Sequence, residues 1–275
     1  MYLAIDVGGT NTRIAISQNL DNPTLLKTAT IKTTNNYQKD LINIESTARS
    51  LCENNILAIG LGIPGVINPE KTGLELAPNL SSWNGKSTKR DFENIFGCPT
   101  YLDNDARVAA LGETVFGYGK SRDFIFIVWG SGIGGTQVIH LRGNLNLFSF
   151  EPGHQIIRRG GIYSSSGQYG DLEAYVGGKW IKKLYDIDAQ SLNEDQWLEV
   201  INNFAQGIIN IVAIRPTDLI IFTGGVAINQ AERIKQLHDK VAKELKIYPT
   251  PEMILSKYGQ EIGLYGGLAL IKVNS

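Results

Sequence analysis

Cysteine is scarce in this sequence, and its two thiols offer little chemistry. Only Cys52 and Cys98 occur among 275 residues. They lie in a helix-like and a pre-strand segment, which fits reduced core thiols better than the disulfide framework of a small secreted protein. Neither is a good candidate for a catalytic nucleophile.

Long hydrophobic runs and an excess of one charge are also missing. No stretch reaches the roughly 18 apolar residues that a membrane-spanning helix requires, so no membrane contact is expected. The formal net charge is −1, and the acidic and basic residues are scattered, so no nucleic-acid partner is expected either. The sequence starts at Met1 directly in a strand pattern without a charged leader, which predicts a cytoplasmic protein.

Apolar residues are plentiful, at 43% of the chain. This content supports a sizeable core in one large domain or two moderate ones, and we predict two. The first comprises residues 1–105 together with a C-terminal helix at about 262–275, and the second comprises residues 106–261. The fold class is α/β with mixed sheets.

The two predicted domains begin with similar patterns. In the first, the strands Tyr2–Asp6 and Arg13–Ser17 flank the turn Gly8–Asn11. In the second, the strand Phe124–Trp129 is followed by the glycine-rich turn Gly130–Gly135 and a returning strand over 136–141. The similarity predicts an internal duplication.

The two glycine-rich turns suit a nucleotide phosphate tail, because glycine lets backbone N–H groups approach phosphate oxygens without a Cβ in the way. Asp6 precedes the first turn and is interpreted as a partner of Mg²⁺, directly or through water. Either turn alone would be an ordinary hairpin turn, but the matched pair favours phosphate binding. Neither turn fits the Walker or the dinucleotide-binding pattern.

Asp105 follows a short strand at the start of a helix pattern and has two interpretations. It caps the helix, which is common for aspartate and contributes about 1 kcal/mol. Alternatively, it is the base that accepts the proton of a substrate hydroxyl attacking the γ-phosphate of ATP. Its position near the predicted domain border favours the catalytic role.

Several short motifs occur in one order along nearly the whole chain, and together they resemble the ROK family of bacterial sugar kinases and sugar-responsive repressors. They are Asp6–Arg13, Gly62–Gly65, Ala77–Leu80 with Trp83 and Gly85, Asn104–Ala106 to Gly112–Glu113, Gly130–Gly135, Glu151–His154 and Gly224–Gly225. The resemblance implies two actin-like, ribonuclease-H-like domains with nucleotide and sugar in the cleft between them. It also implies a homodimer or homotetramer.

The resemblance implies roles for individual residues. It makes Asp105 the catalytic base and Asp6 the residue near Mg²⁺. The residues implied in ATP binding are Gly8, Gly9, Thr10, Gly132, Gly134, Gly135, Gly224 and Gly225. Those implied in sugar binding are Gly65, Asn79, Asn104, Glu151, His154 and Glu173. His154 as a structural histidine and Asn79 as a turn residue remain alternatives.

The chain departs from the family in a segment that often holds a structural zinc. There the family has a histidine and three cysteines, and the matching cysteine positions here are Ser164, Ser166 and Asp171. Serine hydroxyls are poor Zn²⁺ ligands beside thiolates, so no zinc is expected. A second departure is the bulky segment 144–150, which could reshape the sugar pocket.

The resemblance therefore predicts ATP-dependent phosphorylation of a hexose, with glucose as the first choice of substrate. N-acetylmannosamine, N-acetylglucosamine or fructose is the alternative, because pocket differences of one methylene are not readable from sequence. A sugar-responsive repressor is disfavoured because the first phosphate strand starts at Tyr2, leaving no room for a preceding helix-turn-helix. A non-catalytic sugar sensor would be expected to lose Asp6 or Asp105, and both are present.

Overall fold

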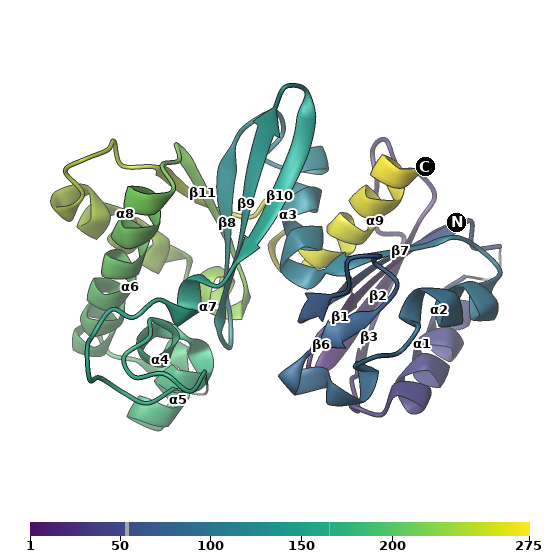
Figure 1. Cartoon of the computed structure of the whole chain (residues 1–275), viewed down its shortest axis with the longest axis horizontal. Coiled ribbons are helices and arrows are strands. Elements are labelled where there is room, and N and C mark those ends of the chain that lie inside the picture. The colour runs from purple at the N-terminus through teal and green to yellow at the C-terminus, as the bar shows by residue number, and fades with distance from the viewer. Residues whose placement is uncertain (53–54, 165) are drawn as a thin grey trace. The chain divides into compact units, whose positions relative to one another are not determined.

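The computed structural model describes residues 1–52, 55–164 and 166–275. The chain forms two compact units, Met1–Lys120 with Glu261–Ser275, and Ser121–Gln260. Each unit is built on a mixed five-stranded sheet (Figure 1). We call them unit 1 and unit 2.

The sheet of unit 1 has the order β3-β2-β1-β4-β7. Its first three strands form an antiparallel meander, and β4 and β7 run parallel to β1. The strands are β1 (Tyr2–Val7), β2 (Asn11–Ser17), β3 (Lys27–Lys32), β4 (Ala58–Ile63) and β7 (Thr100–Asn104), and a two-stranded sheet adds β5 (Val66–Ile67) and β6 (Leu74–Leu76). The helices are α1 (Tyr37–Leu51), α2 (Thr88–Phe96), α3 (Asp105–Phe116) and α9 (Ile262–Asn274), with the 3₁₀ turn η1 (Pro78–Trp83). A further 3₁₀ turn, η4 (Gly259–Glu261), spans the point in the sequence where unit 2 ends and unit 1 resumes.

Side chains on the two faces of the first sheet differ in size, since successive residues of a strand point to opposite sides. Leu3 and Ile5 of β1 belong to the same core cluster as Leu41 and Ile44 of α1. Ala4 points to the other face and packs with α9. Large residues thus face α1 and small residues face α9, and Figure 1 shows these two helices on opposite sides of the sheet.

Glycines allow α9 to lie close to the sheet and to α3. A Cβ on Gly60 of β4 would lie 1.9 Å from the backbone oxygen of Gly267 in α9. A Cβ on Gly266 would lie 2.1 Å from the backbone oxygen of Val108 in α3. Because backbone atoms cannot rotate away, these contacts require glycine.

This packing moves the domain border predicted near Asp105. The border falls after Lys120, because α3 packs against α9 and against β4 and β7 of unit 1. Helix α3 therefore belongs to the first unit and not to the second. The C-terminal helix, predicted to return to the first domain, does so as α9.

We expect Gly60→Ala to lower the free energy of unfolding by about 1–3 kcal/mol, the usual cost of overpacking a core. Urea unfolding followed by circular dichroism measures the change. Gly225→Ala is the matched control, because no atom lies within 4 Å of its added Cβ. Equal stability of the two variants would contradict the close packing of α9.

The sheet of unit 2 has the order β10-β9-β8-β11-β12, which repeats the topology of the first. An antiparallel meander is again followed by two strands parallel to its first strand. The strands are β8 (Phe124–Trp129), β9 (Ile133–Leu141), β10 (Asn144–Phe150), β11 (Leu219–Thr223) and β12 (Glu252–Leu255). The helices are α4 (Glu173–Val176), α5 (Gly178–Tyr185), α6 (Glu194–Ile214), α7 (Gly225–Asn229) and α8 (Ala231–Glu244), with 3₁₀ turns η2 (Pro152–His154) and η3 (Ala189–Ser191). The repeated strand order agrees with the predicted duplication.

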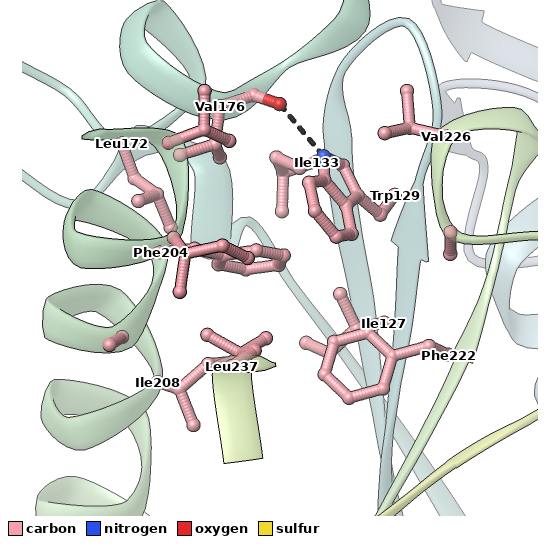
Figure 2. Close-up of a cluster of buried hydrophobic side chains, with 14 of the residues drawn as sticks. Ile127, Trp129, Ile133, Leu172, Val176, Phe204, Ile208, Phe222, Val226 and Leu237 are labelled. Carbon is pink, nitrogen blue, oxygen red and sulfur yellow. Dashed lines mark hydrogen bonds between the residues drawn. The ribbon is translucent and has the colours of Figure 1, made fainter. Parts of the chain in front are cut away.

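Aliphatic and aromatic side chains together fill the core of unit 2 (Figure 2). The Trp129 indole N–H donates to the backbone oxygen of Val176 at 2.7 Å, so its one polar atom is satisfied. The ring of Phe204 from α6 meets Trp129 edge-on, with centroids 4.7 Å apart. Within the described residues, α6 is the one helix long and apolar enough to cross a membrane by length and composition. Ten of its residues, including Phe204, are buried, so the core accounts for its apolar side chains.

Candidate active site

The first glycine-rich turn, Gly8–Thr10, joins β1 to β2. The Gly8 N–H donates to the backbone oxygen of Asn11 at 2.9 Å, and a Cβ on Gly8 would lie 2.8 Å from that oxygen. Gly9 and Thr10 are exposed. A Cβ on Gly9 would lie 3.4 Å from the Cβ of Asn79, so this predicted sugar-binding residue lies beside the turn.

Asp6 is the titratable group next to this turn. Its side chain is 18% exposed, and its Oδ2 lies 3.5 Å from the Arg13 guanidinium. Burial raises the pKa of Asp6, and the charge and hydrogen bond of Arg13 only partly offset that increase. A carboxylate whose loss of hydration is only partly offset by Arg13 is suited to a position near a second cation. Mg²⁺ that is held mostly by phosphates and water needs only one or two such protein ligands.

Glycine on α9 makes room for this carboxyl group. A Cβ on Gly263 would lie 2.6 Å from the Asp6 carboxyl carbon. The sequence motifs had assigned no role to Gly263, because its contact with Asp6 depends on how α9 packs.

Asn104 and Asp105 lie where β7 meets α3. Asn104 is the N-cap, and its Oδ1 accepts from the N–H groups of Ala106 at 3.1 Å and Arg107 at 3.2 Å. Its Nδ2 donates to the backbone oxygen of Gly65 at 3.0 Å. The capping role considered for Asp105 therefore belongs to Asn104.

Asp105 is the first residue of α3, and its Oδ1 accepts from the Ala106 N–H at 2.8 Å. A negative charge here interacts favourably with the helix dipole. Because β1, β4 and β7 are parallel, Asp6, Gly65 and Asp105 lie toward the same edge of the sheet. This edge, at the carboxyl ends of the strands, is where open α/β sheets usually bind ligands.

Asp103 fixes this junction, and no sequence motif had identified it. Its carboxylate is nearly buried, lies 2.7 Å from the Lys71 ammonium and 3.1 Å from the Arg107 guanidinium, and accepts the Asn104 N–H at 2.8 Å. The position of Lys71 is a tertiary feature, so only the spacing of Asp103 and Arg107 could have been noticed in the sequence.

The second glycine-rich turn is shorter than predicted. Strand β9 begins at Ile133, so the turn is Gly130–Gly132. Gly134 and Gly135 lie in the strand, paired with Val128 and Ile127. They were predicted to belong to a phosphate loop. The prediction of the turn was wrong there, because the ladder with β8 extends to the Trp129–Ile133 pair.

Gly130 belongs to a pocket of about 400 Å³ within unit 2. It is also lined by Ser131, Lys179, Gly225, Asn229 and Gln230, among others, and the pocket is large enough for part of a nucleotide. Gly224 has φ +96°, and a Cβ on it would lie 2.4 Å from the backbone oxygen of Trp129, so glycine is required beside the pocket. The motifs had identified Gly225 of α7, but they missed the other residues of α5 and α7 that line the pocket, because those lie outside the glycine motifs.

The predicted sugar-binding residues of unit 2 lie close together. Burial raises the pKa of Glu151, while the nearby His154 lowers it and Glu173 raises it. Glu173 Oε2 accepts from the Ile133 N–H at 2.9 Å, and a Cβ on Gly132 would lie 2.3 Å from that oxygen. One oxygen of Glu173 is therefore already used to hold the second turn.

The zinc-like segment contains a hydrogen-bonded cluster. The side chains of Ser164, Ser166 and Asp171 contact one another, and His154 Nδ1 lies 3.6 Å from Asp171. Among the described residues, no group of three or more His, Cys, Asp or Glu side chains is placed to hold a metal. The absence of zinc stays a prediction.

The two units share one mixed-sheet topology, and each carries a glycine-rich turn after its first strand. A profile of the ROK family matches residues 2–274. The chain belongs to the ROK family.

Relatives in this family include enzymes and regulators. The chain is 30% identical to a glucokinase of Streptomyces coelicolor over 184 residues, which cover 65% of this chain and 57% of the relative. It is 38% identical to a xylose repressor of Caldicellulosiruptor bescii over 125 residues, which cover 44% of this chain and 31% of the repressor. The chain thus spans between about a third and somewhat over half of the length of these curated relatives.

Solved structures give the same picture of the fold. A glucokinase from Streptomyces griseus in complex with glucose and AMPPNP has a TM-score of 0.78 at 21% identity, covering 98% of both chains. A ROK transcriptional regulator, a homologue of the E. coli MLC protein, has a TM-score of 0.83 at 18% identity, covering 99% of this chain and 77% of that one. Both classes share the actin-like fold, so the fold alone does not separate them.

Proposed function

We propose that the chain is a sugar kinase that transfers the γ-phosphate of ATP to a hexose hydroxyl, with Asp105 as the catalytic base. The observation that carries this proposal is the pair of carboxylates Asp6 and Asp105 at the carboxyl edge of one sheet. A protein that only binds a sugar needs polar groups that hydrogen-bond the sugar hydroxyls. It needs neither a catalytic base nor a carboxylate near Mg²⁺.

The proposed reaction is an in-line displacement. Asp105 accepts the proton of the sugar hydroxyl, whose oxygen forms a bond to the γ-phosphorus while the bond from that phosphorus to the bridging oxygen breaks and ADP leaves. Mg²⁺ would neutralise phosphate charge, with Asp6 near it. The N–H groups of Gly8 and Gly130 already donate to the backbone oxygens of Asn11 and Gly132, so the N–H groups of Gly9, Thr10, Ser131 and Gly132 would be the ones to hold phosphate oxygens. The pocket of unit 2 would hold the nucleoside.

The candidates for sugar recognition in unit 1 are Gly65, Asn79 and Asn104. Those in unit 2 are Glu151, His154 and Glu173. Asn104 would act with its remaining amide capacity, and its cap and its bond to Gly65 keep it rigid. Each hydroxyl-matching group that is left unpaired in a buried site costs about 1–3 kcal/mol, which makes rigid polar side chains effective discriminators.

A coupled ADP-release assay tests the proposal, with ATP, Mg²⁺ and glucose, fructose, mannose, N-acetylglucosamine or N-acetylmannosamine. We expect turnover on one of these sugars, with glucose first. A cytoplasmic location and a homodimer or homotetramer stay predictions. Silence on all sugars, with sugar binding still detectable by calorimetry, would overturn the kinase proposal.

A sugar sensor is the second candidate, and the similarity to the xylose repressor favours it. A sensor binds its sugar equally well with or without nucleotide and releases no ADP. The ADP-release assay therefore separates a sensor from a kinase.

A further inference from the structure

A buried carboxylate in unit 2 lies beside three polar side chains, one from η2 and two from the segment just before the carboxylate in the chain. Asp171 is fully buried. Its Oδ2 accepts from the hydroxyls of Ser164 and Ser166, the latter at 2.7 Å, and its Oδ1 accepts from the Ala174 N–H at 3.1 Å. We call His154, Ser164, Ser166 and Asp171 the Asp171 cluster.

His154 completes the cluster. Its Nδ1 is buried, has no partner at hydrogen-bond distance, and lies 3.6 Å from Asp171 Oδ2, while the side chain as a whole is 39% exposed. A buried carboxylate this close favours a proton on Nδ1, because a nitrogen lone pair facing the carboxylate would be costly away from water. In a neutral imidazole the proton on Nδ1 leaves Nε2 as an acceptor.

The two serines hold the carboxylate in one orientation. Each hydroxyl has one hydrogen to donate, and both hydroxyl oxygens reach the same Asp171 oxygen. Ser164 is itself 2% exposed, and its N–H donates to the backbone oxygen of Gln168. Buried hydrogen bonds of this kind are costly to break, so the cluster resists rotation of Asp171.

The cluster also connects to the second glycine turn. Asp171 Oδ1 binds the first turn of α4, which begins with Glu173, and Glu173 holds the Ile133 N–H next to Gly130–Gly132. The Leu172 N–H donates to the backbone oxygen of Gln155, the residue after His154. His154 and Glu173 are therefore both tied to the residues around Asp171.

We propose that Asp171 is a positioning residue that holds His154 with its proton on Nδ1, so that Nε2 accepts a hydrogen bond from a sugar hydroxyl. The serine hydroxyls and the carboxylate do this without a metal ion. This inference rests on the proposed sugar site. It assigns to Asp171 and the two serines a task that neither the fold nor the family membership assigns.

The test uses the full chain and the variant Asp171→Asn, which keeps the shape and removes the charge. ¹⁵N NMR of the imidazole, with His154→Gln for assignment, should show the Nδ1–H tautomer of His154 in the wild type and a shift toward Nε2–H in the variant. The dissociation constant or KM for the sugar should rise about 10–100-fold, the range that loss of the outer hydrogen-bond partner has for metal-binding histidines, with KM for ATP nearly unchanged. Asp239→Asn is the matched control, because Asp239 lies 3.5 Å from His238 Nδ1 but is exposed.

A second variant covers the case in which Asp171→Asn does not fold. Replacing Ser164, Ser166 and Asp171 together by Cys supplies thiolates that prefer Zn²⁺. This variant should bind one zinc, and its sugar affinity should fall when zinc is chelated, whereas the wild type should be insensitive to the chelator.

Three results would overturn the inference. They are an unchanged His154 tautomer in Asp171→Asn, an unchanged sugar affinity in that variant, and a full equivalent of zinc in the purified wild type. The NMR experiment needs no sugar. If the wild type binds none of the sugars, the proposed function fails, and with it the role of Nε2, while the tautomer still decides whether Asp171 orients His154.

Discussion

Asp105→Asn is expected to lower kcat by about 10²–10⁴-fold while the affinity for the sugar stays within about threefold of the wild type, the pattern for loss of a general base. The asparagine cannot accept the hydroxyl proton during attack on the γ-phosphorus. It keeps an oxygen at the position of Oδ1, so the contact with the Ala106 N–H survives. ADP release and calorimetric sugar titration measure the two quantities.

The local structure makes this substitution a clean test. Asn104, and not Asp105, is the N-cap of α3, so its two hydrogen bonds to the helix start remain when the carboxylate is replaced. Asp195→Asn in the first turn of α6 is the matched control, because it removes an acidic residue at a comparable helix position. Near-normal turnover of Asp105→Asn would exclude the proposed base, and an equal loss in Asp195→Asn would indicate a general effect on folding.

Asp6→Asn is expected to reduce kcat/KM on the order of 10²-fold and yet to raise the stability of the folded chain near pH 7. The loss of activity follows from the loss of the carboxylate near Mg²⁺. The gain in stability follows because burial raises the pKa of Asp6, so the ionised form is disfavoured in the folded state. Titration calorimetry with Mg²⁺ and ATP should show weaker binding in parallel.

The sign of the pH dependence is fixed by the direction of this shift. A raised pKa means that the folded chain binds more protons than the unfolded chain, so wild-type stability falls as the pH rises through the folded pKa of Asp6. The advantage of Asp6→Asn should therefore be full above that pKa and vanish below the unfolded value of about 3.9. Urea unfolding at a series of pH values from about 3 to about 7 measures it.

Asp21→Asn provides the control of opposite sign. The hydrogen bond and charge of Lys272 lower the pKa of Asp21, so its removal should cost stability above the unfolded pKa and not add to it. If Asp6→Asn were also less stable than the wild type at pH 7, the pairing with Arg13 would outweigh burial, and the assignment of Asp6 as an undercompensated carboxylate would be wrong.

The sequence was a good guide where local patterns decide structure. The strands flanking both turns were predicted, and Phe124–Trp129 was predicted with its observed bounds. The first turn was predicted from its glycines. The structure gives the reason for one of them, because a Cβ on Gly8 would lie 2.8 Å from the backbone oxygen of Asn11. The second turn was predicted too long, because glycine is compatible with a strand as well as with a turn, and only the ladder between β8 and β9 showed where the strand begins.

Several features of the candidate site depend on contacts between distant segments. Lys71 reaches Asp103 across 32 positions of sequence separation, and no motif contains both. The domain border near Asp105 was wrong because the border depends on the packing of α3 against α9. The pocket beside Gly130 and Gly225 joins residues from several elements in the same way.

The sequence by itself determined that this chain is a ROK family protein with a duplicated α/β architecture, because glycine turns, strand patterns and the order of short motifs are local properties. Only the tertiary structure decided which charged and polar side chains contact one another. It joined Asp6 to Arg13 and Gly263, and Asp171 to His154 and two serines. Burial, charge pairing and hydrogen bonding between segments arise only when the chain folds, so these contacts cannot be read from residue order alone.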